Sequence, residues 1–321
     1  MAALLDVQDL KVYFRKNGAV SKAVDGVSFA VGEGETLGLV GESGCGKSVT
    51  SLSIMRLVAC PPAEFAGGKI LYRGDDIVQM GEHRLRGIRG KEIAMIFQEP
   101  MSSLNPVFTA GYQIAEMLTT HTSMGKKEIR EKVLSLLRKV EIDQPERVYK
   151  SYPHELSGGM RQRVMIAMAV ACEPKLLIAD EPTTALDVTI QAQILKLFRR
   201  LKEEFHMSLL LITHNLGLVS DLADRIAVMY AGIIAETGRT RDIFEAPLHP
   251  YTQGLIRSVP KLGERKARLE TIPGMVPDAA RKPAGCPFHP RCYLKGDICA
   301  KELPVLREVR PGHFAACHFA K

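Results

Sequence analysis

The sequence has 321 residues, of which 46% are hydrophobic and 25% charged, and its formal net charge is +7. This composition excludes a disordered or collagen-like chain, and the length suits one large globular domain or two smaller ones of about 100–200 residues each. Residues 1–239 hold 29 basic and 28 acidic side chains, whereas residues 240–321 hold 14 and 8. The positive charge therefore belongs to the last quarter of the chain.

The N-terminus does not resemble a secretory signal, because Asp6 comes early and no basic segment leads into a long apolar stretch. The longest glycine-free apolar run, Val164 to Cys172, has nine residues. A membrane-spanning helix needs roughly 20. We therefore expect a chain of the reducing cytoplasm that meets a membrane only through partner chains.

Short β-rich segments open the chain. Leu4 to Phe14 and Ala23 to Val31 are predicted to be antiparallel strands with a hairpin-like connection. The apolar run Thr36 to Val40 is typical of a strand buried on both faces. A glycine-rich loop separates it from a helix predicted over Ser48 to Val58.

Helices and strands alternate through the middle of the chain. Apolar residues at helical spacing predict an amphipathic helix over Lys126 to Val140. A helix over Met160 to Cys172 precedes the apolar strand Leu176 to Ala179, and Ser208 to Thr213 is a further strand. This alternation predicts an α/β sheet whose strand ends carry the functional site. We place a boundary near residue 240, where proline and basic residues become frequent.

Residues 41–48 read GESGCGKS and fit the pattern G-x-x-x-x-G-K-[ST] between the buried strand and the helix. Glycines let the backbone N–H groups of such a loop point into one concavity, which binds phosphate together with the helix N-terminus. We expect Lys47 to reach the β- and γ-phosphates and Ser48 to coordinate Mg²⁺. Cys45 is interpreted as a small filler rather than a redox switch. The predicted contacts here are Gly41, Ser43, Gly44, Cys45, Gly46, Lys47, Ser48 and Val49.

Two carboxylates, Asp180 and Glu181, directly follow the apolar strand that ends at Ala179. At a strand end Asp180 can reach the coordination shell of magnesium, and Glu181 can polarise an attacking water. Such a pair is common by itself, so this interpretation depends on the phosphate loop.

Further motifs make the chain resemble the ATPases of ATP-binding cassette (ABC) transporters. Residues 156–163, LSGGMRQR, resemble the signature of this family and precede the Asp180 strand at the family's usual distance. The other matching positions are Gln98 in the Q-loop, Ala185-Leu186-Asp187 in the D-loop, His214 as the switch histidine and, for the aromatic that stacks on adenine, Phe14 or its neighbour Tyr13.

The resemblance implies an α/β fold of the ABC ATPase (P-loop NTPase) type, with a RecA-like core, an antiparallel β subdomain and a helical signature subdomain at about residues 100–170. Residues 1–240 would form the nucleotide-binding domain. Residues 241–321 would form a small cysteine-rich C-terminal extension.

The family's mechanism pairs two such domains head to tail, so that each ATP lies between the phosphate loop of one and the signature of the other. By resemblance, Ser48, Gln98 and Asp180 hold Mg²⁺ directly or through water. Glu181 orients or deprotonates the attacking water, and His214 contacts the γ-phosphate. The signature residues that would contact the partner's ATP are Ser157, Gly158, Gly159 and Gln162.

One position departs from the family pattern: Asn215 follows the switch histidine where an acidic residue is usual. The loss of this acidic charge bears on the local helix cap more than on the chemistry. Asparagine also caps helices well.

Several longer segments resemble the peptide and nickel importers in particular. They are residues 98–106, 182–193 and 249–252, with GCPF at 285–288, PRC at 290–292 and PGHFAAC at 311–317. This resemblance, strongest to the dipeptide-importer ATPase, implies a second related ATPase subunit, two transmembrane permeases and an extracytoplasmic peptide-binding protein as partners. It places the chain peripherally at the cytoplasmic face of the bacterial inner membrane, with residues 98–106 facing the permeases.

Four cysteines, Cys286, Cys292, Cys299 and Cys317, gather near the C-terminus. Disulfides are not expected in the cytoplasm. Structural zinc usually uses closer C-x(2–4)-C pairs, whereas four thiolates suit a [4Fe–4S] cluster, in which each iron takes one ligand. The spacing leaves zinc, a cluster and unligated thiols open. The resemblance to peptide-importer ATPases with this tail favours the [4Fe–4S] cluster.

Other functions remain as alternatives. The same subunit could serve a nickel or heme importer, since the cargo never touches this chain. A soluble ABC ATPase acting on nucleic acid is disfavoured, because there is one compact cassette and the basic tail lacks interleaved aromatic residues. A regulatory cassette without turnover would need a damaged catalytic position, and all are filled. Because the nucleic-acid alternative is disfavoured, we expect no nucleic-acid partner.

Overall fold

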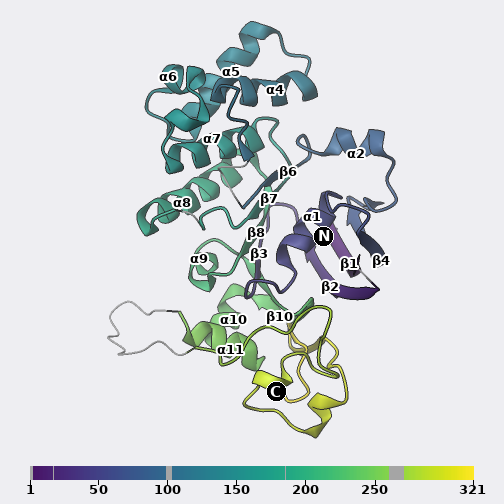
Figure 1. The fold of residues 1–321 in the computed structure, drawn as a ribbon. Coiled ribbons are helices and arrows are strands. Elements are labelled where there is room, and N and C mark those ends of the chain that lie inside the picture. The colour runs from purple at the N-terminus through teal and green to yellow at the C-terminus, as the bar shows by residue number, and fades with distance from the viewer. Residues whose placement is uncertain (1–2, 17, 99–102, 185, 260–270) are drawn as a thin grey trace. The chain divides into compact units, whose positions relative to one another are not determined.

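A computed structural model describes residues 3–16, 18–98, 103–184, 186–259 and 271–321 of the chain (Figure 1). These residues belong to two compact units. The first unit comprises residues 1–79 and 211–321, and the second comprises residues 80–210. Strand β8 (Ser208–Thr213), predicted with these bounds, crosses from the second unit into the first.

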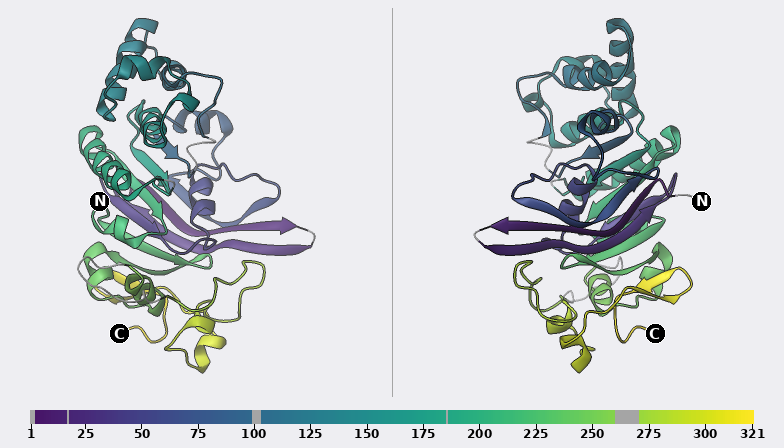
Figure 2. Two further views of the ribbon diagram at one scale, coloured as in Figure 1. Left: turned by 60° about the vertical axis from the view of Figure 1, so that its left-hand side comes forward. Right: turned by 90° about the vertical axis from the view of Figure 1, so that its right-hand side faces the viewer.

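The first unit contains an antiparallel sheet with the strand order β2-β1-β4-β5. Its two long strands are visible side by side in Figure 2. Both strands predicted near the N-terminus are confirmed, with longer bounds than expected. The strands are β1 (Leu5–Lys16), β2 (Ala19–Val31), β4 (Ala63–Tyr72) and β5 (Asp75–Asp76).

A second run of strands in this unit has the order β11-β12-β10-β9-β3. All five residues of β3 (Thr36–Val40) are buried, as its apolar sequence predicts, and β3 pairs in parallel with β9. The C-terminal segment returns to this sheet, because Ala315 of β12 pairs with Glu236 of β10. The remaining strands are β9 (Arg225–Tyr230), β10 (Ile233–Arg239), β11 (Arg307–Arg310) and β12 (His313–Ala315).

Short helices complete the first unit. Helix α1 (Lys47–Ile54) ends four residues before the predicted Val58, since Arg56 adopts a left-handed backbone conformation with φ 50°. The others are α9 (Leu216–Ser220), α10 (Thr240–Glu245), α11 (Pro250–Arg257) and the 3₁₀ turns η2 (His289–Arg291) and η3 (Asp297–Ala300).

The second unit combines two parallel strands, β6 (Ile93–Ile96) and β7 (Leu176–Asp180), with helices. The predicted amphipathic helix is confirmed as α5 (Lys126–Lys139), whose apolar side is buried. It packs with α4 and α6, and the three helices lie together in Figure 1. The other helices are α2 (Glu82–Ile88), α4 (Ala110–His121), α6 (Pro145–Lys150), η1 (Pro153–Glu155), α7 (Gly158–Val170) and α8 (Val188–Phe205).

Across the described ranges, no helix combines the length and the apolar character needed to cross a membrane.

Candidate nucleotide-binding site

The predicted phosphate loop connects β3 to α1 in the first unit. Gly46 caps the helix with a backbone φ of 107°, which residues other than glycine rarely adopt. At Gly41 a Cβ atom would lie 2.2 Å from the carbonyl oxygen of Met229, so only glycine fits there. Close backbone packing therefore requires the first and last glycines of the loop, Gly41 and Gly46. Ser43 and Gly44 are exposed, and Ser48 and Val49 are half-buried in the first turn of α1.

Lys47 folds back over this loop and is only 5% exposed. Its Nζ donates hydrogen bonds to the carbonyl oxygens of Gly41 at 2.7 Å and Glu42 at 3.0 Å. The ammonium group therefore lies within the loop, where it can exchange these carbonyl contacts for phosphate oxygens.

Cys45 is fully buried beneath the loop. Burial raises the pKa of its thiol, although the charge of nearby Lys47 acts in the opposite direction. A buried thiol that stays protonated is unreactive. This environment favours the interpretation of Cys45 as a filler over that of a redox switch.

The two aromatic candidates for adenine stacking, Tyr13 and Phe14, are neighbours on β1 and so point to opposite faces of the strand. The Tyr13 hydroxyl donates a hydrogen bond to Oδ1 of Asp25 at 2.5 Å, and Lys22 Nζ lies 5.4 Å from the centre of its ring. Burial, with a smaller contribution from Asp25, raises the pKa of Tyr13 to about 12. Only one of the two rings can stack on a given adenine.

In the second unit, the parallel pairing of β6 and β7 brings Gln98 and Glu181 together. Gln98 Nε2 donates a hydrogen bond to Glu181 Oε2 at 3.1 Å, and Thr184 Oγ1 donates to the same oxygen at 2.8 Å. Asp180 is the last residue of β7 and is buried. Glu181 has a φ of 47°, a strained region for a residue with a side chain. Such strain is typical of functional positions.

The predicted signature begins helix α7. Ser157 is the N-cap, and its side chain accepts a hydrogen bond from the N–H of Met160 at 3.3 Å, so the helix begins two residues before the predicted Met160. Gly158 and Gly159 form the first turn. Gln162, also predicted to contact the partner's ATP, is 0% exposed. Neither polar atom of its amide has a hydrogen-bond partner within the described residues.

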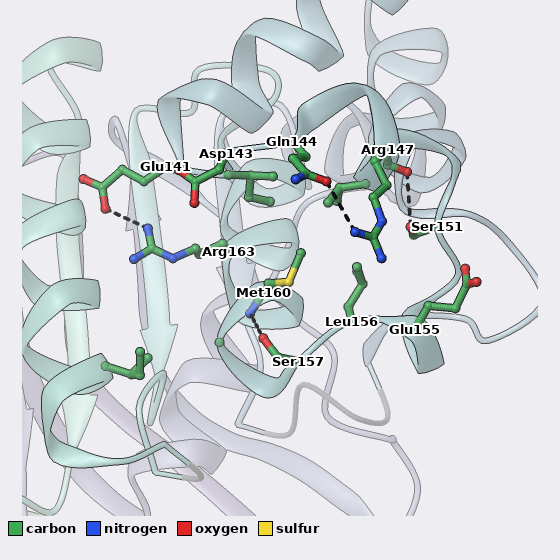
Figure 3. Close-up of a pocket in the computed structure, with 14 residues that line it drawn as sticks. Glu141, Asp143, Gln144, Arg147, Ser151, Glu155, Leu156, Ser157, Met160 and Arg163 are labelled. Carbon is green, nitrogen blue, oxygen red and sulfur yellow. Dashed lines mark hydrogen bonds and ion pairs between the residues drawn. The ribbon is translucent and has the colours of Figure 1, made fainter.

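A pocket in the second unit borders the signature (Figure 3). Arg163 from α7 forms an ion pair with Glu141 at 2.8 Å on one side of it, and the same guanidinium donates a hydrogen bond to the carbonyl oxygen of Val140. The hydrogen bond from Arg163 lowers the pKa of Glu141. These contacts tie the signature helix to the end of α5.

Strand β8 ends at Thr213, directly before His214, which is exposed. Asn215 caps α9, since its Oδ1 accepts a hydrogen bond from the N–H of Gly217 at 3.0 Å. The residue that departs from the family pattern therefore does cap this helix.

Comparison with known proteins supplies the family. Residues 24–184 match the family described as ABC transporter. The chain belongs to this family. Residues 235–299 match a second family, described as oligopeptide/dipeptide transporter, C-terminal region. The chain is therefore an ABC transporter ATP-binding subunit, an ATPase, and its C-terminal part is of the peptide-transporter type.

Relatives of this ABC ATPase match over nearly the full chain. It is 51% identical over 315 residues to the probable peptide ABC transporter ATP-binding protein y4tR of Sinorhizobium fredii, covering 98% of this chain and 94% of that protein. It is 52% identical over 304 residues to the dipeptide transport ATP-binding protein DppD of Bacillus subtilis, covering 95% and 91%.

The solved structures agree on the fold. A dimeric post-hydrolysis state of the ATP-binding cassette MJ0796, bound to ADP and Pi, matches with a TM-score of 0.67 and 27% identity over 74% of this chain and 99% of that chain. The predicted fold class, an ABC ATPase with α/β sheets, is confirmed.

The metal site predicted at the C-terminus of this ABC ATPase is not confirmed. All four tail cysteines are free thiols, with Cys286 and Cys299 buried. In the described part of the chain, no group of three or more histidine, cysteine or acidic side chains could hold a metal ion. Among these residues, no set of side chains is placed to coordinate a single zinc ion.

Parts of two predicted motifs lie outside the described residues. They are residues 99–102 of the segment that continues the Q-loop and Ala185 of the D-loop. The rest of the D-loop is described, and its Asp187 caps α8 by accepting a hydrogen bond from the N–H of Ile190 at 3.0 Å.

Sequence reasoning missed two residues that contact predicted site residues. Thr184 shares the Glu181 carboxylate with Gln98, and its place three residues after Glu181 is the only sign of this in the sequence. Glu42, a variable position of the phosphate-loop pattern, pairs with Arg291 of the tail. No local pattern predicts that contact.

Proposed function

We propose that this chain powers the import of dipeptides or oligopeptides through a membrane ABC transporter. The observation that carries the proposal is the match to the oligopeptide/dipeptide C-terminal family, together with 52% identity to a dipeptide transport ATP-binding protein along 95% of the chain. An importer of nickel or heme is the alternative. The cargo would bind the partner proteins and not this chain, so the residues of this chain do not select it.

For the reaction itself, we propose that Lys47 and the loop amides bind the phosphates and that Ser48, Gln98 and Asp180 hold Mg²⁺. Bound Mg²⁺ would neutralise charge on the phosphates. Glu181 orients or deprotonates the water, and the hydrogen bonds from Gln98 and Thr184 fix the direction of its carboxylate. His214 contacts the γ-phosphate.

We further propose a head-to-tail pair with a second, related ATPase subunit, in which the signature contacts the partner's nucleotide through Ser157, Gly158, Gly159 and Gln162. The pair would dock on two permease subunits at the cytoplasmic face of the inner membrane, supplied by an extracytoplasmic peptide-binding protein. Residues 1–240 would act as the nucleotide-binding domain and residues 241–321 as an extension. The support is the family membership and the exposed start of α7, at Ser157 and Gly158.

For the tail, we retain the [4Fe–4S] cluster as a proposal, with Cys286, Cys292, Cys299 and Cys317 as its ligands. Sulfurs around a cubane serve four separate irons, so they need not converge on one point as they do around zinc. The other three thiols are near enough to raise the pKa of Cys286 through their charges, after the larger effect of burial. Backbone N–H groups act in the opposite direction and lower the thiol pKa of three cysteines: Phe288 acts on Cys286, Leu294 on Cys292, and Phe319 and Ala320 on Cys317. An effect of this sign favours ligand thiolates.

The transport proposal is tested by reconstituting this chain with its permeases and second ATPase in liposomes and adding the loaded binding protein. Labelled dipeptide should accumulate on the side of the membrane that carries the ATPase subunits, and only when ATP and Mg²⁺ are present on that side. Accumulation of nickel or heme without peptide would overturn the assignment of the cargo.

The cluster proposal is tested separately, by anaerobic purification, a visible spectrum and a count of bound iron and zinc. We expect a brown protein with about four irons per chain, since a cubane contains four. A colourless protein with one zinc would overturn the cluster.

A further inference from the structure

The carboxylate of Glu42, inside the phosphate loop, forms an ion pair with Arg291 of the C-terminal segment. Arg291 Nη1 lies 2.7 Å from Glu42 Oε2, and Nη2 lies 3.0 Å from Oε1. Two parallel N–H···O bonds between a guanidinium and a carboxylate are both strong and directional. The pair connects positions 249 residues apart in the sequence, and both lie in the first unit.

Arg291 is fixed in place by other contacts. Its side chain is only 5% exposed. Nε donates a hydrogen bond to the carbonyl oxygen of Pro273 at 2.8 Å, and Nη2 donates to that of Ile272 at 3.2 Å. The guanidinium also lies 5.8 Å from the ring centre of Tyr230 and 5.9 Å from that of Phe288. A side chain held this way presents its charge to Glu42 in one geometry.

The backbone of Glu42 is held as well as its side chain. Its N–H donates a hydrogen bond to the hydroxyl of Tyr251 at 2.8 Å, and its carbonyl oxygen accepts one from Lys47 Nζ at 3.0 Å. The ring of Tyr251 packs against Phe288, with centres 5.4 Å apart. The C-terminal segment therefore determines the position of a residue that also contacts the lysine of the phosphate loop.

Charge gives this contact a consequence for binding. A carboxylate in a loop that binds a nucleoside triphosphate repels the phosphates, and the repulsion is strong at short range in a partly buried site. Arg291 supplies a compensating positive charge on the same carboxylate. We propose that Arg291 is a positioning residue of the C-terminal segment that, through Glu42, sets the geometry and charge of the phosphate loop and thereby the affinity for ATP.

This inference rests on the proposed role of the loop, and it predicts effects of opposite sign for the two partners. R291Q leaves the Glu42 charge uncompensated, so the Kd for ATP should rise about tenfold. E42Q leaves the Arg291 charge uncompensated, so ATP should bind about threefold more tightly. The double variant E42Q/R291Q should return to near the wild-type Kd.

The measurement is the Kd of a fluorescent ATP analogue for the purified full-length chain, with KM and kcat from ATP hydrolysis by the assembled transporter. We expect KM to follow Kd while kcat changes less than about twofold, because the pair does not touch the water-activating residues. R307Q is the matched control, since Arg307 is also in the tail but donates its hydrogen bond to the carbonyl oxygen of Ala320.

Weaker binding in both single variants, without recovery in the double variant, would show a merely structural role and overturn the inference. Wild-type affinity in R291Q would overturn it too. If R291Q does not fold, E42Q decides alone, since only charge compensation predicts tighter binding. Absence of ATP binding by the wild-type chain would instead refute the proposed role of the loop, so the two failures are distinguishable.

Discussion

Gln98 and Glu181 are joined by a hydrogen bond of 3.1 Å between Nε2 of the glutamine and Oε2 of the glutamate. They lie 83 residues apart, and the parallel pairing of β6 with β7 places the ends of their strands next to each other. Because Thr184 donates to the same oxygen, one carboxylate oxygen is occupied by two donors. This arrangement fixes the direction of the carboxylate.

Replacing Glu181 with glutamine should leave ATP binding intact and slow hydrolysis at least ~10²-fold, the scale of losing one preorganised catalytic group. The amide keeps the shape of the side chain but cannot accept a proton from water. Single-turnover hydrolysis and nucleotide binding measure the two steps separately.

The matched control for this substitution is Glu203→Gln, at an exposed position of α8 in the same unit. It should hydrolyse ATP at the wild-type rate. Unchanged turnover in Glu181→Gln would remove Glu181 from the proposed role.

The predictable parts of the fold have a continuous or periodic apolar pattern. Strand β3 was predicted from its continuous apolar run and α5 from apolar residues at helical spacing, and the structure buries both sets of residues. The end of α1 was predicted four residues too late, because the sequence does not show that Arg56 takes a left-handed conformation. Local pattern therefore identifies elements better than their ends.

The parts of the site that could not be predicted depend on contacts between distant segments. The motif identifies Glu42 only as a variable position, whereas its partner Arg291 follows from how the C-terminal segment packs on Tyr230. Gln162 was assigned to the signature from its place in the motif, but packing of α7 buries it. Motifs specify residue types and order, and packing decides exposure.

Replacing Lys47 with alanine should raise the Kd for ATP more than about tenfold, because a charge-assisted hydrogen bond to phosphate is lost. The variant also loses the hydrogen bonds to the carbonyl oxygens of Gly41 and Glu42, which hold the loop closed around the ammonium group. Binding of a fluorescent nucleotide measures the effect. Lys69→Ala, at an exposed position of β4, should bind like the wild type, and a similar loss there would mean that net charge alone is responsible.

Replacing Asn215 with alanine should destabilise α9 by about 1 kcal/mol, the usual cost of losing a side-chain cap. The hydrogen bond at risk joins Asn215 Oδ1 to the N–H of Gly217. Amide exchange at Gly217 should become faster in Asn215→Ala and stay slow in Asn215→Asp, which keeps an acceptor. Equal exchange in the two variants would show that the cap contributes nothing.

The stability of the first unit should fall on acidification because of His249. Burial lowers the pKa of this fully enclosed imidazole from 6.5 to about 4, although the charge of Glu236 opposes the shift. Between these two values the unfolded chain binds a proton that the folded chain does not, so the free energy of unfolding decreases as the pH falls from about 7 to 4. The loss from this group is about 3 kcal/mol, and below pH 4 it no longer grows.

The matched variant is His249→Asn, which does not titrate but can still accept the hydrogen bond that His249 Nδ1 takes from the N–H of Tyr251 at the start of α11. Urea unfolding at pH 7 and at pH 4.5 should show a smaller drop in the free energy of unfolding for the variant than for the wild type. The absolute stability of the variant is lower because a smaller side chain leaves space in the core, so the decisive quantity is the difference between the two pH values. The same drop in both proteins would assign the acid sensitivity to other groups.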